Sequence, residues 1–123
     1  MTTTFEALRV WHDARRLTLR IYRITQGDTF VVDRLMSDQI RRAAISIMSN
    51  IAEGYERARP REFLRFLSIA KGSAGEVRCQ LYAAEDLGYL STEKAIQLRQ
   101  QAAIVSREIA ALARSEEQRM VRK

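Results

Sequence analysis

The sequence predicts an all-α protein, folded as an antiparallel up-down-up-down four-helix bundle. The first observation is a heptad seam, in which apolar or small residues alternate four and three positions apart, a pattern that a helix presents to other helices. Its members are Phe63, Leu67, Ala70, Ala74, Val77, Leu81, Ala84 and Gly88. The second is that one proline and five glycines in 123 residues leave little material for turns. The elements must therefore be few and long.

The first helix is expected over about residues 4–26. Thr3 can cap it while Glu6 reaches back, in a Thr-x-x-Glu capping box. Gly27 is expected to end it as a left-handed stop. The expected core stripe at 100° per residue is Val10, Ala14, Leu17, Ile21 and Ile24.

The second helix is expected over about residues 34–57, with Asp33 as its N-cap. Residues 28–32 form the loop before it. Three residues of this loop are too apolar to be solvated and are expected to cover one end of the bundle: Phe30, Val31 and Val32.

The third and fourth helices are expected over about residues 60–87 and 92–113. Pro60 suits a first turn, where its missing N–H costs nothing. Gly88 ends the third helix, and Ser91 caps the fourth. The expected seam of the fourth helix is Ala95, Leu98, Ala102, Val105, Ile109 and Leu112. Short connections make neighbouring helices antiparallel.

Residues 1–113 are expected to form one domain, and the basic tail 114–123 loses its periodicity and is expected to fray. The composition, 46% hydrophobic and 29% charged, is typical of a soluble globular chain. The lone Cys79 fits a reducing compartment, so we expect a cytoplasmic protein. No apolar stretch has membrane-spanning length, and charges interrupt the apolar residues of the N-terminus, unlike a signal peptide.

An arginine row lies on the first helix. The net charge is +6, and all but three of the 21 basic residues are arginines. Four of them, with His12, fall within about 80° of one another around the helix: Arg9, Arg16, Arg20 and Arg23. Such a row could follow the phosphate backbone of a nucleic acid. It could equally be a solvated outer face.

The same helix is apolar on a second flank, which one bundle cannot bury together with its core stripe. The flank consists of Leu8, Trp11, Leu19 and Tyr22. Surplus apolar and aromatic surface of this kind favours an oligomer interface. The alternative is that Trp11 and Tyr22 roof the core of the monomer.

Two further groups are interpreted as mainly structural. Several arginines around the second and third helices lie three or four residues from an acid such as Asp38, Glu53 or Glu62, which favours ion pairing. The arginine cluster consists of Arg41, Arg42, Arg57, Arg59, Arg61 and Arg65. A polar row beside the core of the second helix favours a hydrogen-bond network that fixes register, with a ligand site as the alternative: Gln39, Ser46, Asn50 and Glu53.

The sequence shows no catalytic constellation, so we expect a protein that is not an enzyme and has no metal or cofactor. Di-metal bundles use Glu-x-x-His pairs, whereas His12 is the only histidine here. The Gly-Ser-Ala-Gly run at 72–75 lies within a predicted helix, where small residues permit close helix approach and do not cradle phosphate. Cys79 has no expected histidine partner.

Several of these segments carry a family resemblance. QIRRAAISIMSNIAEG, then REFLRFLSIAKGSAGEV and LGYL, together with the upstream FEALRVWHDARRLTLRIY, resemble the four-helix bundle family named after proteins encoded in intervening sequences of bacterial 23S rRNA genes. The resemblance covers about residues 5–112. The matching positions are Gln39, Arg41, Arg42, Ser46, Asn50, Glu53, Gly54, Glu62, Phe63, Gly72, Ser73 and Glu76. The family often has a proline in the first loop and a serine before the Glu-Phe pair, where this chain has Phe30–Val31 and Pro60–Arg61.

The resemblance implies a homopentamer. A similar bundle, the accessory variability determinant of diversity-generating retroelements, forms a basic pentamer that binds a reverse transcriptase and nucleic acid. The leading hypothesis is therefore a non-enzymatic homo-oligomer that binds RNA or DNA through arginines, with no membrane partner. The rival hypothesis is a scaffold that binds a protein and has no nucleic-acid ligand.

Overall fold

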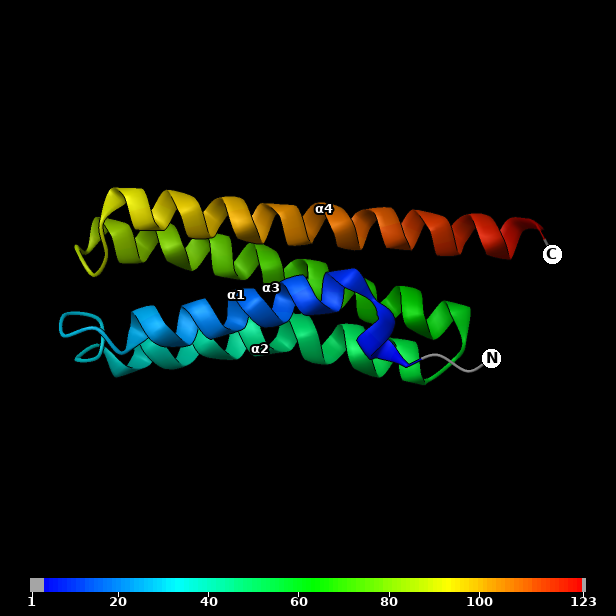
Figure 1. Cartoon of the computed structure of the whole chain (residues 1–123), viewed down its shortest axis with the longest axis horizontal. Coiled ribbons are helices and arrows are strands. Elements are labelled where there is room, and N and C mark those ends of the chain that lie inside the picture. The colour runs from blue at the N-terminus through cyan, green and yellow to red at the C-terminus, as the bar shows by residue number, and fades with distance from the viewer. Residues whose placement is uncertain (1–3, 123) are drawn as a thin grey trace.

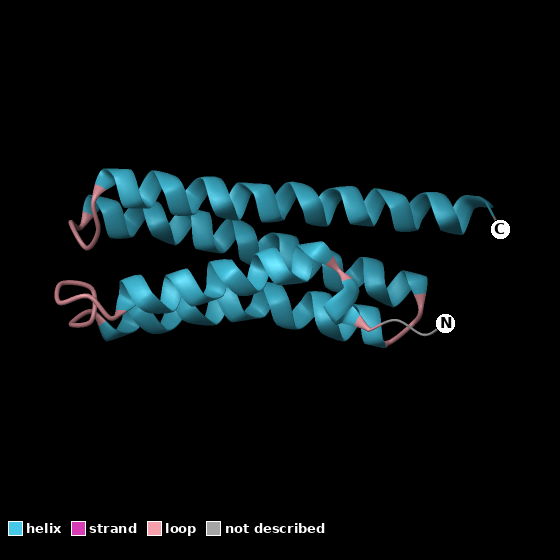
Figure 2. Ribbon diagram, viewed as in Figure 1, coloured by secondary structure: helices cyan, strands magenta, loops and turns pink. Residues whose placement is uncertain are grey.

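The structure, a computed structural model, describes residues 4–122, of which nearly all are helical (Figures 1 and 2). A 3-10 turn, η1, is followed by four α-helices: η1 Phe5–Ala7, α1 Arg9–Thr25, α2 Arg34–Glu56, α3 Pro60–Asp86 and α4 Thr92–Arg122. No strand occurs within the described residues. The predicted all-α four-helix architecture is confirmed.

Each helix packs on its neighbour in sequence, and α1 closes the bundle against α4. The α1–α2 and α3–α4 loops lie at one end of the bundle, and the α2–α3 loop lies at the other (Figure 1). Because α1 is the shortest helix and α4 the longest, the C-terminal turns of α4 extend beyond the beginning of α1.

The core follows the predicted seams. In α3 every predicted member from Phe63 to Ala84 is buried, while Gly88 lies past the helix end and is exposed. In α1 the predicted stripe is buried except for Ile24, which is half-buried. The largest fully buried side chains contributed by α1 and α2 are Leu17, Ile21, Ile40, Ile47 and Ile51.

Three predicted helix starts and one predicted stop have the expected chemistry. Asp33 accepts a hydrogen bond from the Met36 N–H at 3.0 Å, and Ser91 accepts one from the Lys94 N–H at 3.1 Å. Pro60 is the first residue of α3. That helix ends in a Schellman motif, which Gly88 permits because its φ is +78°.

The predicted start and stop of the first helix are wrong. Leu8 adopts an extended conformation (φ −84°, ψ 121°), so α1 begins at Arg9. Tertiary contacts favour this break, because the Phe5 ring packs edge-on against Trp11 and the Phe5 N–H donates to Glu56 of α2. Thr3, the predicted cap, lies outside the described residues. At the other end Gln26 is the C-cap in αR geometry, and Gly27 does not have a positive φ.

Two predictions at the ends of the bundle also need correction. Phe30 is fully buried, but Val31 and Val32 are 49% and 75% exposed, so one residue of the loop closes this end, not three. The chain predicted to fray after residue 113 is helical to Arg122. In that segment Glu116 is buried at a position that continues the α4 seam, with its carboxylate 2.6 Å from Arg119.

The glycines of α2 and α3 differ in their surroundings. A Cβ added to Gly54 would lie 2.6 Å from the Phe66 Cβ, so this glycine permits α2 and α3 to approach closely. A Cβ added to Gly72 or Gly75 would meet nothing within 4 Å. The close approach expected at the Gly-Ser-Ala-Gly run therefore involves its buried members, Ser73 and Ala74, and not its glycines.

None of the helices in the described part of the chain is long and apolar enough to cross a lipid bilayer.

Candidate nucleic-acid interface

The arginine row lies on the side of α1 that faces α4. Arg9 is 3.8 Å from Glu108 of α4, and Arg20 donates a hydrogen bond to Gln101 on the same helix. The row therefore borders the α1–α4 seam instead of lying on the outermost face of the bundle.

Two members of the row have acidic partners within α1. Arg16 forms an ion pair with Asp13, three residues before it. Arg9 is 3.9 Å from the same carboxylate. The arginine side chains nevertheless remain in solvent, with 88% of Arg9 and 64% of Arg16 exposed. Exposed ion pairs contribute little to stability, because solvent and salt screen them. These guanidinium groups can therefore exchange a carboxylate for a phosphate at low cost.

The other two members differ from each other. Arg20 is half-buried, and its bond to Gln101 holds it against α4. Arg23, in the last turn of α1, is exposed. The row thus offers three exposed arginines, and its fourth member helps to join two helices.

A pair of carboxyl groups lies beneath the row. The side chains of Asp13 and Glu108 are only 17% and 25% exposed. Burial, together with hydrogen bonding and charge from Asp13, raises the pKa of Glu108 to about 7 against the opposing effect of Arg9 and Arg16. The Oε1 atom of Glu108 is buried with no hydrogen-bond partner among the described residues.

Most of the predicted interface flank packs on this chain's own core. Leu8 and Trp11 contact the core cluster. The Phe5 ring also packs edge-on against the Trp11 ring, with 4.8 Å between their centroids. The Tyr22 ring is covered by the guanidinium of Arg41, 4.8 Å from its centroid. Leu19 differs, because it is 48% exposed. The alternative of a roof over the monomer core accounts for Trp11, whereas Leu19 stays exposed.

The polar row of α2 divides into two parts. Ser46 and Ser73 share a hydrogen bond of 2.9 Å between α2 and α3, and the Asn50 amide donates to Ser46. Glu53 instead forms an ion pair with Arg57 at 2.8 Å. The first part is the structural network that the sequence predicts, and it lies within one chain.

Three further family positions, Arg41, Glu62 and Phe63, also have partners in the chain. The Arg41 Nε donates to the Thr25 hydroxyl at 2.7 Å. Glu62 accepts from Arg57 at 2.9 Å, and this contact adds to that of Glu53 in raising the pKa of Arg57. Phe63 is buried beneath Tyr55. The ion pairing predicted for this arginine cluster is therefore present for Arg57 and Arg59, at the α2–α3 loop.

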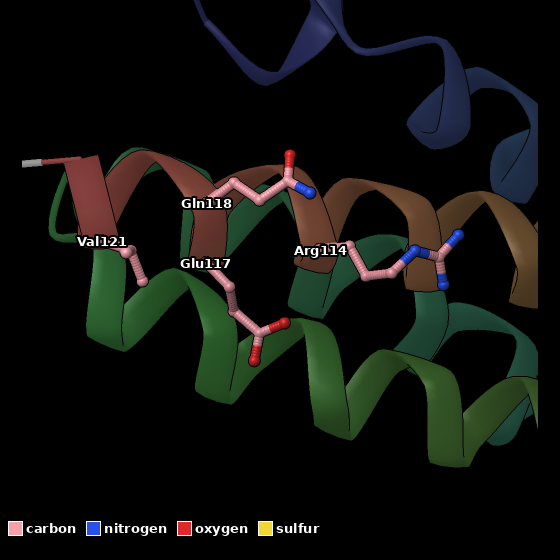
Figure 3. A pocket seen from close by; sticks show the side chains of 4 residues that line it. All are labelled: Arg114, Glu117, Gln118 and Val121. Atoms are coloured by element: carbon pink, nitrogen blue, oxygen red, sulfur yellow. The ribbon is translucent and has the colours of Figure 1, made fainter.

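The surface has shallow hollows. One of about 390 Å³ lies between α2 and α3 and is lined by Gln39, Arg42, Ala43, Ser46 and Glu76. Another of about 460 Å³ lies along the last turns of α4, where Glu117 points toward α3 and Gln118 points away from it (Figure 3). The described residues contain no group of three histidine, cysteine or acidic side chains that could hold a metal ion.

The acidic partners of the arginine row were not predicted. Asp13 lies four residues after Arg9 and three before Arg16, a spacing that predicts ion pairs on one helix. Glu108 and Gln101 give no such signal, because the rotation of α4 relative to α1 is decided only by packing.

The fold and this surface define a four-helix bundle with a basic border along one helix seam. The chain belongs to the 23S rRNA-intervening sequence protein family, whose family model matches residues 6–111. It is similar to a crystal structure of a protein of unknown function from the S23 ribosomal protein family of Bacteroides thetaiotaomicron. The TM-score is 0.78 at 21% identity, over 85% of this chain and 97% of that one. The chain has no significant match among curated proteins.

Proposed function

We propose that the protein is a non-enzymatic homo-oligomer, with five subunits as the favoured number, that binds RNA or another nucleic acid through phosphate contacts. The observation that supports this proposal is the stripe of exposed guanidinium groups of Arg9, Arg16 and Arg23 on a chain of net charge +6. Arginine suits the role because its planar fork can donate two hydrogen bonds to one phosphate.

The length of the stripe fits a nucleic-acid strand. Arg9 and Arg23 are fourteen positions apart on α1, so they are separated along the helix axis by about 21 Å, at 1.5 Å per residue. A strand of duplex DNA has a phosphate every 3.4 Å or so of axis, so the stripe spans about six phosphates. The stripe contains no phenylalanine, tyrosine or tryptophan on which a base could stack, so we expect little discrimination between base sequences.

Oligomerisation would repeat this stripe around an assembly and multiply its charge. The resemblance to a homopentameric family favours an assembly, and the exposed Leu19 next to the arginine stripe on α1 supports it. A nucleic acid that contacts several subunits would then gain avidity without any additional kind of contact.

A triple substitution tests this proposal. Arg9, Arg16 and Arg23 are changed together to glutamine, while Arg20 is kept so that its bond to Gln101 remains. Anisotropy of a labelled RNA at 50 mM salt should show an affinity at least about tenfold lower, because three phosphate contacts are lost. Several RNA sequences should lose affinity alike.

A matched control carries the same change in charge elsewhere. Three exposed arginines on α3 and α4 are changed to glutamine: Arg61, Arg78 and Arg114. This variant should keep most of the wild-type affinity. Equal losses in the two variants would show that binding follows net charge alone and that the α1 stripe is not the site.

The rival function is a scaffold that binds a protein. One observation favours it: Gly72 and Gly75 lie within α3, yet none of the described residues has an atom within 4 Å of a Cβ added at either position. Glycine inside a helix costs about 0.5–1 kcal/mol relative to alanine, so a partner helix packing there would give these glycines a role. Absence of RNA and DNA binding at 50 mM salt would favour the scaffold.

A further inference from the structure

The Asp13–Glu108 pair joins α1 to α4 at a place where these helices have few other polar links. Glu108 lies on α4 and Asp13 on α1, and the two carboxyl groups are in hydrogen-bonding contact. Both are largely shielded from water. Two carboxylates in contact repel each other, so the pair is stable when one carboxyl carries a proton.

The charged groups that face the pair all come from α1. Arg16 binds the Asp13 carboxylate directly, so Asp13 is the better-compensated partner. Arg9 lies 3.8 Å from Glu108 and 3.9 Å from Asp13 and is almost fully exposed, so water screens its charge. On α4, Gln101 also contacts α1, but it is neutral and accepts a hydrogen bond from Arg20.

Glu108 is therefore the partner that holds the proton. Its Oε1 atom is buried with no donor among the described residues, and an ionised oxygen in that position would be left uncompensated. Hence the neutral form of Glu108 is the one that fits the closed seam.

We propose that Asp13 and Glu108 form a proton-dependent clamp that holds α1 against α4 when Glu108 is protonated and loosens when that proton is lost. This proposal does not depend on whether the arginine row binds a nucleic acid. The other described polar links of this seam are weak or distant: Arg9, which lies 3.8 Å from Glu108, is 88% exposed and screened by water, and the Arg20–Gln101 hydrogen bond lies further along the helices.

The direction of the pH dependence follows from linkage. Glu108 loses its proton at a pKa of about 7 in the folded protein, compared with 4.5 for an unperturbed glutamate. Between these values the folded state binds more protons than the unfolded state, so stability falls as pH rises. The contribution is fully present below about pH 4.5 and is lost as pH rises through about 7.

Carboxyl carbon NMR on the wild-type protein tests the clamp directly. The Glu108 resonance should titrate with a midpoint near pH 7, and Asp13→Asn should move that midpoint toward acid pH because the neighbouring charge is removed. A wild-type midpoint near 4.5 would overturn the proposal, whatever the variants do.

Hydrogen exchange tests the consequence for α1. From pH 6 to pH 8, after correction for intrinsic exchange, the protection of α1 amides should fall about tenfold in the wild-type protein. Glu108→Gln keeps the size of the side chain without its charge and should abolish this fall. The control Glu117→Gln, an exposed position on the same helix, should keep it. Equal behaviour of the two variants would contradict the clamp.

Discussion

Gly54 decides how closely α2 and α3 can pack. The space beside its Cα is filled by Phe66 and Phe63, and an added Cβ would lie 2.6 Å and 3.1 Å from their atoms. The nearest of these atoms is the Cβ of Phe66, which cannot move without its helix. A methyl group at position 54 would therefore force the two helices apart.

Alanine substitutions compare this glycine with one that faces open space. Gly54→Ala should lower the free energy of unfolding by about 1–2 kcal/mol, because overpacking outweighs the gain in helix propensity. Gly72→Ala should raise it by about 0.5–1 kcal/mol, because a Cβ there meets nothing. Urea unfolding by circular dichroism measures both. If Gly72→Ala destabilised the protein or changed its mass in solution, another subunit must cover that face.

For single residues, the sequence predicted the roles of those whose partners are close in the chain. Asp33, Ser91 and Pro60 act at helix ends, where spacing along the chain is sufficient evidence. It did not predict the burial of Glu108, because this depends on how α4 packs against α1.

The apolar flank of α1 is a feature of the whole element. Sequence periodicity identified the flank but could not separate the residues that roof the core from those left exposed. The structure assigns Trp11 to the first group and Leu19 to the second. Leu19 is thus the position at which a partner can be tested without disturbing the monomer core.

A charge at this position should separate the subunits. Leu19→Glu would place a charged group in an apolar interface, so light scattering at micromolar concentration should show a mass near 14.2 kDa with helicity retained. The wild-type protein should show several times that mass. Leu35→Glu is the control, because Leu35 is 70% exposed on α2 and lies outside the flank. A monomeric wild-type protein, or an unchanged mass for Leu19→Glu, would contradict the predicted interface.

The ends of α1 and α4 show where prediction from sequence fails. The break at Leu8 depends on contacts of Phe5 with Trp11 and Glu56, which lie outside the local pattern. The extra turns of α4 contain a buried glutamate where an apolar residue would continue the seam, so the periodicity is lost although the helix continues.

For the whole molecule, the heptad seams predicted four helices and their antiparallel order, and the structure confirms that architecture. The candidate site was predicted only as a row of residue types. The row lies at the α1–α4 seam because of how the helices are rotated in the bundle. The same rotation brings Arg20 into a hydrogen bond with Gln101, so its guanidinium is not free for a ligand.

The salt dependence of RNA binding by the wild-type protein tests the central claim most directly, because it counts phosphate contacts. Three exposed arginines of one subunit can give a slope of log affinity against log salt concentration of at most about −2 to −3. An assembly that presents several rows to one strand should give a slope steeper than about −3. A slope within the range of one row would contradict binding by several subunits, and no measurable affinity at 50 mM salt would contradict nucleic-acid binding altogether.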